Sequence, residues 1–300
     1  MKKKQDAYFF KLLAIAVLFC VLSGFLTFCQ KEEPASVIEP EVTTEPIEPP
    51  TTVPPPTVPA SVFEKTLEER MIEAAAQYYG VSPDFYPEDM YKLLKRHKEA
   101  QKYVLSYPEE KDKEHPIDMS EFKDVEGVPL FIQWDERWGY IKYGKNIAGL
   151  NGCGPVSLSM VAYYYTRDEA MRPDKILDFS YKSGYCVPGH GTAWTLISEG
   201  AVKLGFKVKK LSNVKSQVIE ELEAGHPIIF NAGAGDFTSS SHYLVMVGVE
   251  DGMIRINDSN SRRNSEKLWD FDQFKSQIRA MWAISYEPPQ ETVPQESNQP

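Results

Sequence analysis

Cysteine and histidine are scarce in this chain, which has four cysteines and five histidines among 300 residues. Two of the cysteines, Cys20 and Cys29, lie in an apolar run near the N-terminus, so only Cys153 and Cys186 remain for a folded domain. Two cysteines do not make a disulfide framework. The cysteines and histidines also lack the spacing of metal ligands, and we therefore expect no metal site and no cofactor.

Positive charge is also in deficit. The chain has 33 Lys and Arg against 43 Asp and Glu, a net charge of -10 and a pI of about 5.2. Nucleic-acid-binding domains carry a basic patch that this composition does not supply, so no nucleic-acid partner is expected. Apolar residues make up 42% of the chain, close to the average for globular proteins, so it can bury a core in one or two domains.

One long hydrophobic run stands out at residues 12–29, LLAIAVLFCVLSGFLTFC, which is uncharged and long enough to cross a bilayer as a helix. The lysines before it predict a cytoplasmic N-terminus. We therefore expect residues 1–30 to form a basic tip and a single transmembrane anchor at the cell membrane, with the rest of the chain outside the cytoplasm. A cleaved signal peptide is the alternative, disfavoured because no small-x-small site follows the run. Lipid modification of Cys29 is a third, disfavoured by the bulky Phe28.

Proline, glutamate and threonine dominate residues 31–60, which cannot pack a core. This composition predicts a linker of polyproline II character that would reach roughly 90 Å at about 3.1 Å per residue. It favours a spacer between membrane and domain, although a plain disordered linker has the same composition. Residues 288–300 have a similar composition and are predicted to be a disordered tail.

Helical periodicity marks residues 61–118. Apolar residues recur with a helical period over residues 63–80, and a second helix is predicted over residues 87–107, after a proline and two acids. We expect a small helical lead-in subdomain here. His97 and His115 lie in charged surroundings and are predicted to be surface histidines without a role.

The main domain is predicted over residues 119–287. After a helix that begins near Cys153, three segments that stop at glycine predict further helices, at residues 173–184, 192–205 and 214–225. Strands follow in the segments PIIFNAG, HYLVMVGVED, MIRINDS and RAMWAISYE, with Asp251-Gly252 as the turn of a hairpin. Helices followed by an antiparallel sheet are typical of an α+β fold.

The segment NGCGPVSLSM, residues 151–160, places a lone thiol at the start of a helix. Pro155 suits the first turn, so Cys153 is predicted to lie at the helix N-terminus, where unpaired N–H groups and the helix dipole stabilise a thiolate. Flanking glycines would let a substrate approach. Cys153 is therefore a candidate nucleophile, although free cysteine is also a common buried residue in tight turns.

A nucleophilic thiol needs a base, and His190, His226 and His242 are the candidates. His226 fits a structural role before a strand, and His190 lies in a glycine loop. His242 opens a core strand after the polar run GDFTSSS, which would hold its ring rigidly at a cleft. The predicted hairpin brings Asp258, at the end of the next strand, beside His242, where it could orient the imidazole. Asn257 is the fallback partner.

Together, the motifs VPLFIQWDERWG, NGCGPVSLSM, GHGTAW, AGDFTSSSHYLVMVG and INDS resemble the C39-like cysteine peptidases, an exported bacterial group with a papain-like fold. The resemblance covers residues from about 61 to 286. It implies N-terminal helices packed on an antiparallel sheet, with Cys153 as nucleophile, His242 as base and Asp258 as its orienting group. It also implies that Gln133 lines the oxyanion hole, a role that its side-chain amide could perform with the Cys153 N–H.

Two positions depart from the family pattern. Ser241 stands where the family usually has glycine, and Ser259 where it usually has proline. Cys186 is predicted to be a spare thiol, although a disulfide with Cys153 is conceivable outside the cell and would block the nucleophile.

The sequence thus predicts a membrane-anchored, extracytoplasmic cysteine peptidase that hydrolyses amide bonds of a peptide or protein substrate through a Cys-His-Asp triad. One alternative is an amidase or endopeptidase of wall peptides, with the cell wall as partner. The other is a non-catalytic surface binding module on a peptidase scaffold.

Overall fold

The computed structural model describes residues 65–189 and 191–288, which belong to one compact unit that begins at Val62. The predicted anchor, the linker at residues 31–60, the tail beyond residue 288 and His190 lie outside the described residues. In the part that is described, no helix is both long and apolar enough to cross a membrane.

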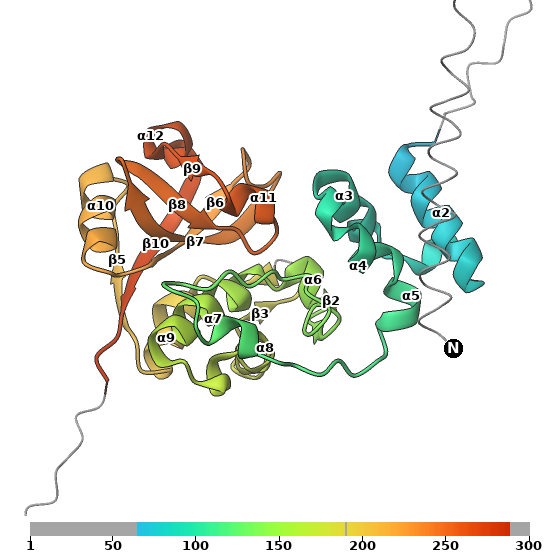
Figure 1. The fold of residues 1–300 in the computed structure, drawn as a ribbon, viewed down its shortest axis with the longest axis horizontal. Helices are drawn as coiled ribbons and strands as arrows, with labels where there is room; N and C mark the ends of the chain where they lie inside the picture. The colour runs from blue at the N-terminus through green and yellow to red at the C-terminus, as the bar shows by residue number, and fades with distance from the viewer. Residues whose placement is uncertain (1–64, 190, 289–300) are drawn as a thin grey trace, which may run out of the picture. The chain divides into compact units, whose positions relative to one another are not determined.

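A six-stranded antiparallel sheet forms the centre of the fold, in the order β5-β10-β6-β7-β8-β9 (Figure 1). Its strands are β5 (Lys207–Lys210), β6 (Ile228–Gly233), β7 (Ser241–Glu250), β8 (Met253–Asn257), β9 (Leu268–Trp269) and β10 (Ile278–Ser285). The four predicted strands and the α+β order are confirmed. The sequence missed β5 because KVKK has no buried residue, and β9 because it has only two residues.

The hairpin between β7 and β8 is confirmed. Asp251 and Gly252 both have positive φ, 51° and 75°, as the two-residue turns that match the twist of a hairpin require. Glu250 pairs with Met253 next to the turn, and Val245 pairs with Asn257 further along. The beginning of β7 and the end of β8 therefore lie side by side, at the end of the hairpin far from its turn.

Helices cover both faces of the sheet. Alternate strand residues point to opposite sides, so Phe230 and Leu244 enter one core cluster while Ile229 and Val245 enter the other. One face packs against α7 (Cys153–Thr166), which in turn packs on α8 (Pro173–Lys182), and the other face packs against α10 (Lys215–Glu223) and α12 (Phe271–Phe274). Helix α7 is buried from Gly154 to Tyr163, as a central helix that is apolar all round should be.

The N-terminal helices of the unit are α2 (Leu67–Tyr79), α3 (Glu88–Arg96), α4 (Gln101–Leu105) and α5 (Tyr107–Glu110), which we call the lead-in helices. Helix α2 is confirmed and begins with a capping box between Thr66 and Glu69. The single helix predicted over residues 87–107 is wrong, because the chain leaves helical geometry at His97 (φ -127°, ψ 89°). This break turns the chain so that Tyr103 and Val104 of α4 enter the core.

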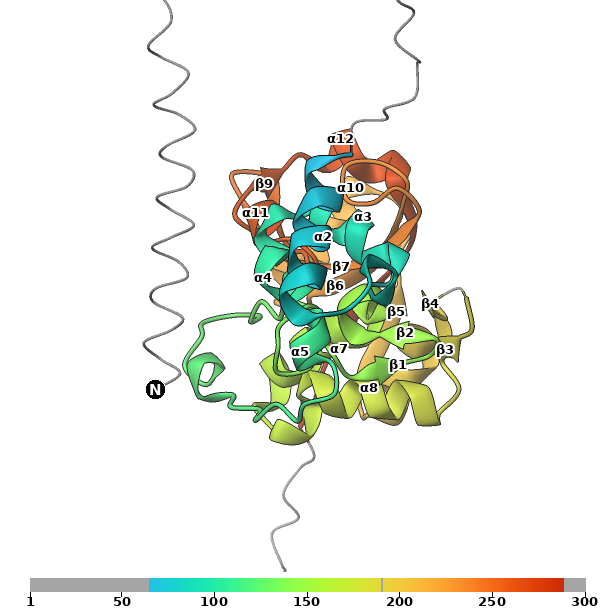
Figure 2. The same cartoon turned by 90° about the vertical axis from the view of Figure 1, so that its right-hand side faces the viewer.

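The lead-in helices share one core with the segment that follows them. Leu94 and Tyr103 pack in the same buried cluster as Ile132, Trp134 and Tyr140. The Tyr103 hydroxyl donates to the Gly139 carbonyl at 2.7 Å, and its ring stacks on Tyr140 with centroids 4.4 Å apart. This core crosses the boundary predicted at residue 118. Figure 2 shows α2, α3 and α4 in front of the sheet.

The helix predicted over residues 192–205 begins later than expected. Gly191 and Thr192 form strand β4 (Gly191–Thr192), which pairs with β3 (Cys186–Val187). The helix starts as a π-helical turn, Leu196–Gly200, and continues as α9 (Ala201–Lys203). Three short elements lie beside the site described below: β1 (Lys142–Tyr143), β2 (Asn146–Ile147) and α6 (Ala148–Asn151).

The shared core makes a prediction about stability. Leu94 is fully buried, so Leu94→Ala should lower the free energy of unfolding by about 2–5 kcal/mol, through lost apolar burial and a cavity. Val202, which is 53% exposed, provides the control. Val202→Ala should change the free energy of unfolding by less than about 0.5 kcal/mol. Urea unfolding followed by tryptophan fluorescence measures both. Equal stability of the two variants would contradict the shared core.

Candidate active site

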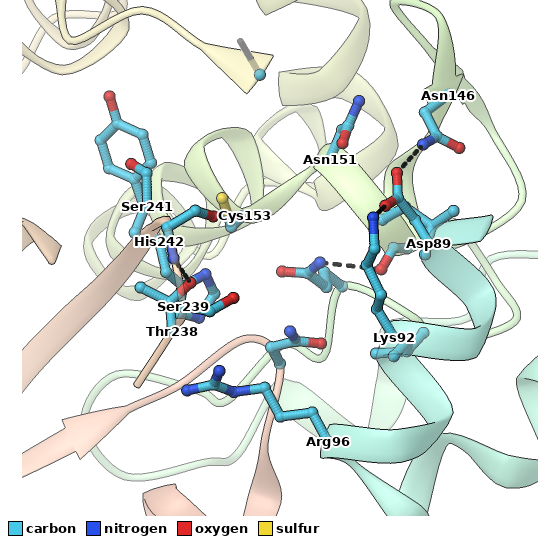
Figure 3. Close-up of a pocket in the computed structure, with 18 of the residues that line it drawn as sticks. Asp89, Lys92, Arg96, Asn146, Asn151, Cys153, Thr238, Ser239, Ser241 and His242 are labelled. Carbon is cyan, nitrogen blue, oxygen red and sulfur yellow. Dashed lines mark hydrogen bonds and ion pairs between the residues drawn. The ribbon is translucent and has the colours of Figure 1, made fainter. Parts of the chain in front are cut away.

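Cys153 is the first residue of α7, directly after the N-cap Gly152, as predicted. Its side chain is partly exposed and lines a cavity of about 620 Å³ (Figure 3). The next residue is necessarily small, because a Cβ at Gly154 would lie 2.8 Å from Thr192 Cβ. Glycine at this position lets β4 approach the start of α7 closely. The thiol lies at the cavity wall beside the first turn of the helix, whose N–H groups have no partner within the helix.

His242 is the second residue of β7, pairs with Ala232 on β6 and is 5% exposed. Its Nε2 lies 2.7 Å from Oδ1 of Asp258. The Cys153 thiol lines the same cavity as His242 and lies close enough for each group to shift the pKa of the other. The structure thus brings together the three residues that the sequence proposed as a triad.

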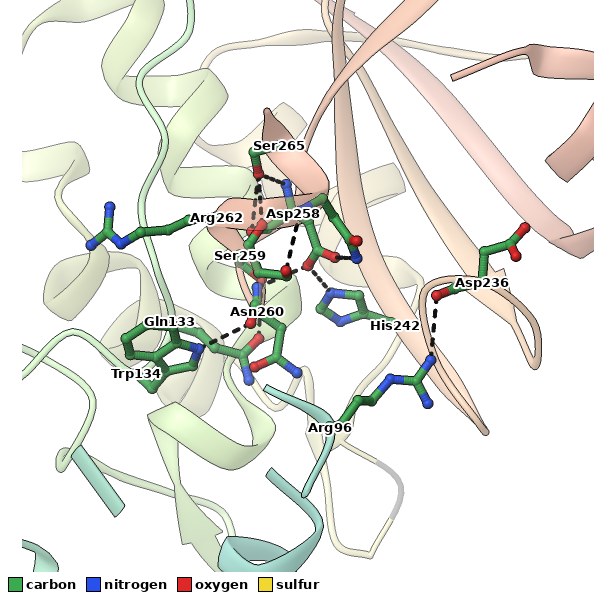
Figure 4. A network of polar contacts seen from close by, with 12 residues as sticks. Arg96, Gln133, Trp134, Asp236, His242, Asp258, Ser259, Asn260, Arg262 and Ser265 are labelled. Carbon is green, nitrogen blue, oxygen red and sulfur yellow. Dashed lines mark hydrogen bonds and ion pairs between the residues drawn. The ribbon is translucent and has the colours of Figure 1, made fainter. Parts of the chain in front are cut away.

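Asp258 follows β8 directly and is completely buried. Besides His242, its carboxylate accepts hydrogen bonds from Nδ2 of Asn264 and from the backbone N–H of Asn260, each at 2.8 Å (Figure 4). Its own N–H donates to Oγ of Ser265 at 2.9 Å. A buried carboxylate with this many donors is held ionised and immobile.

The electrostatics of the three groups depend on one another. Burial by itself raises the pKa of Cys153, but the hydrogen bond and charge of His242 outweigh it and lower that pKa below its ordinary value. Burial lowers the pKa of His242, whereas the charge and hydrogen bond of Asp258, with a contribution from the thiolate, raise it to about 10. Burial raises the pKa of Asp258, but the His242 imidazolium keeps it below its ordinary value. The geometry therefore favours a thiolate and an imidazolium.

Asn257, the fallback partner, is turned away from His242. Its Nδ2 donates to the carbonyl oxygens of Val128 and Pro129, at 3.0 and 3.2 Å. These bonds tie the end of β8 to the segment that leads to Gln133. Asn257 therefore anchors a loop and does not orient the imidazole.

Gln133 lines the same cavity as Cys153 and is 2% exposed. Its side-chain Nε2 donates to the Gly149 carbonyl at 2.9 Å, and its Oε1 accepts from Oγ of Ser259 at 3.0 Å. Its backbone N–H donates to the Ser259 carbonyl at 2.7 Å. Since a primary amide has two N–H groups, one donor of Nε2 remains for a group in the cavity.

The two departures from the family pattern are both accommodated. Ser241 has no positive φ, since among the described non-glycine residues only Arg167 and Asp251 do, so glycine is not required there. Ser259 is fully buried, and its hydroxyl fixes the orientation of the Gln133 amide, which a proline could not do. Sequence reasoning noticed Ser259 only as a departure, because the pairing joins residues 126 positions apart.

Among the described residues, three further histidines and Cys186 lie outside the triad. His226 is a structural residue, as predicted, with Nδ1 2.8 Å from Glu221. The prediction that His97 is a surface residue is wrong: it is 7% exposed and lines the cavity near Asp258 and His242. His115 is also partly buried, beneath Tyr140. Cys153 and Cys186 are both free thiols.

No group of three or more His, Cys, Asp or Glu side chains that could hold a metal ion occurs within residues 65–189 and 191–288.

The buried contact between Ser259 and Gln133 can be tested by a single substitution. Ser259→Ala leaves Oε1 of Gln133 without its donor, and a buried unsatisfied acceptor costs about 1–3 kcal/mol of stability. Ser240→Ala, at an exposed position of the cavity rim, should be close to neutral. Urea denaturation compares the two variants, and a neutral Ser259→Ala would show that the hydroxyl does not hold the amide.

The chain is similar to one protein family and to two solved peptidase structures. The model of the Peptidase_C39 like family matches residues 125–288. The peptidase domain of Streptococcus ComA, a bifunctional ABC transporter involved in quorum sensing, is 20% identical with a TM-score of 0.38, and the match covers 53% of this chain and 99% of that one. A Bacillus anthracis protein described as a C39-like peptidase is 15% identical with a TM-score of 0.33, covering 53% and 96%. No curated protein matches. Because the family model matches more than half of the chain, the protein belongs to the Peptidase_C39 like family.

Proposed function

We propose that this protein is a cysteine peptidase that hydrolyses peptide amide bonds with Cys153, His242 and Asp258. The observation that carries the proposal is the buried contact between His242 and Asp258, at 2.7 Å, with the Cys153 thiol close to the same imidazole. A thiol at a helix N-terminus, a base and an orienting carboxylate are the three parts of an activated nucleophile. The family and the α+β fold with its antiparallel sheet support a function of the cysteine-peptidase type.

The chemistry follows from the charges of these groups. The Cys153 thiolate attacks the amide carbonyl carbon, and the protonated His242 gives its proton to the leaving amine as the C–N bond breaks. The acyl group is then held as a thioester. His242, now neutral, takes a proton from water, the resulting hydroxide attacks the thioester, and the acid product leaves as the thiolate and imidazolium are restored. Asp258 keeps the imidazole in one tautomer throughout.

The negative charge on the attacked oxygen needs donors that are already in place. The remaining N–H of Gln133 Nε2 and the backbone N–H of Cys153 are the donors we assign. The bond from Ser259 prevents the amide from flipping, so Gln133 presents nitrogen and not oxygen to the cavity. Ser259 is therefore a positioning residue.

The location of the reaction follows from the N-terminal sequence. We propose that residues 12–29 anchor the protein in the cell membrane and that the peptidase unit lies outside the cytoplasm. The linker at residues 31–60 would then separate the unit from the bilayer by up to roughly 90 Å. A peptide or protein substrate at the cell surface or in the cell wall is within this range.

Two substitutions test the assigned roles with a library of fluorogenic peptides. Cys153→Ala should abolish cleavage. Gln133→Ala should lower kcat about 100- to 1,000-fold while the rate of Cys153 alkylation stays unchanged, because Gln133 acts on the oxyanion and not on the thiolate. Gln217→Ala, at an exposed position of α10, is the matched control and should leave both rates unchanged. Cleavage that survives Cys153→Ala would overturn the proposed nucleophile.

A further inference from the structure

Part of the lining of the proposed active-site cavity comes from residues that precede the region matched by the family model. That region begins at residue 125, yet helix α3 and the residue after it contribute to the lining (Figure 3). The residues contributed are Asp89, Lys92, Leu93, Arg96 and His97. The lead-in helices therefore shape the space that a substrate would occupy, and their charges act on it directly.

The acidic group of this part of the lining is already neutralised. Among the described residues that line the cavity, Asp89 is the one with a carboxylate. It accepts from Lys92 at 3.1 Å and from Nδ2 of Asn146 at 3.1 Å, a bridge visible in Figure 3. Lys92 also pairs with Glu88 at 3.0 Å, so its charge is shared between two carboxylates.

Two other cations of the lining have no acidic partner among the described residues. Arg96, which is exposed, donates from Nη2 only to the carbonyl oxygens of Gly235 and Asp236, at 3.4 and 3.5 Å. The Asp236 carboxylate itself accepts from Gln277 at 2.6 Å and points away from Arg96 in Figure 4. Lys145, also exposed, has no carboxylate within ion-pair distance in the described chain.

The described lining of the cavity therefore has more cationic side chains, Lys92, Arg96 and Lys145, than carboxylates, of which it has Asp89. A guanidinium with free donors is suited to two parallel hydrogen bonds to a carboxylate. Beside it, His97 is buried with a lowered pKa, caused chiefly by that burial, and its Nε2 has no hydrogen-bond partner, so a neutral polar group adjoins the guanidinium. An acidic group of a substrate is thus favoured here.

We propose that Arg96 binds a carboxylate of the substrate, so that the enzyme prefers peptides with an acidic group close to the cleaved bond. Lys145, in the turn between β1 and β2, lines the same cavity and adds to the same field. The proposal rests on the peptidase function proposed above. The carboxylate is either an acidic side chain or the C-terminus of the peptide, and both present the same planar anion to the guanidinium.

The test uses four fluorogenic peptides of otherwise identical sequence, with Glu or Gln beside the cleaved bond and a free or amidated C-terminus. The wild-type protein should cleave the acidic peptides with a kcat/KM at least tenfold above that of the neutral, amidated peptide. Arg96→Gln should lower kcat/KM about tenfold or more for the acidic peptides and less than about twofold for the neutral one. A lost hydrogen bond to a charged group has an effect of about that size. Arg96→Lys should recover part of the loss.

Lys95→Gln is the matched control, because Lys95 lies on the same helix but does not line the cavity, and it should leave the preference unchanged. A preference confined to the free C-terminus identifies the terminal carboxylate, and one confined to Glu identifies a side chain. Equal cleavage of all four peptides by the wild type, or an equal loss on all four in Arg96→Gln, overturns the carboxylate site and leaves the peptidase function intact. Cleavage of none of the four, nor of any peptide in the library, overturns both.

Discussion

The buried contact between His242 and Asp258 is the interaction on which the rest of the site depends. Both side chains are almost or completely removed from water, and a lone charge there would cost several kcal/mol. Each charge is tolerated because the other lies 2.7 Å away and because Asn264 and the Asn260 N–H satisfy the remaining carboxylate positions. In the proposed mechanism the imidazolium in turn stabilises the thiolate of Cys153, so the reactivity of the sulfur would depend on Asp258 at the end of β8.

The same short segment that carries Asp258 also arranges the proposed oxyanion hole. Ser259 holds Gln133 by its hydroxyl and its carbonyl, and the Asn260 carbonyl accepts from the Trp134 indole at 3.1 Å. One loop thus positions the proposed base His242 through Asp258, and the side-chain amide of Gln133 through Ser259. Because these contacts are buried and paired, the donors would not need to reorganise as charge develops on the substrate.

Local patterns in the sequence were sufficient to bring the three proposed triad residues together and to predict most of the sheet. The Asp251-Gly252 turn has positive φ at both positions, so it fixed the β7-β8 pairing and placed Asp258 beside His242. What the sequence missed depends on contacts between distant segments. His97 was expected on the surface because its neighbours in the chain are charged, yet tertiary packing buries it against the site and breaks the predicted helix there. Strand β5 follows from its pairing with β10 and not from its own composition.

The central claim is that His242 keeps Cys153 ionised, and the rate of Cys153 alkylation by iodoacetamide as a function of pH tests it most directly. The site predicts that the wild-type thiolate persists well below the free thiol value of about 8.5 and is lost only as falling pH protonates it. In His242→Ala the stabilising charge is gone and burial remains, so the apparent pKa should rise to 8.5 or above, while Cys186→Ala should leave the profile unchanged. An ordinary thiol profile in the wild type, unaltered by His242→Ala, would contradict the account.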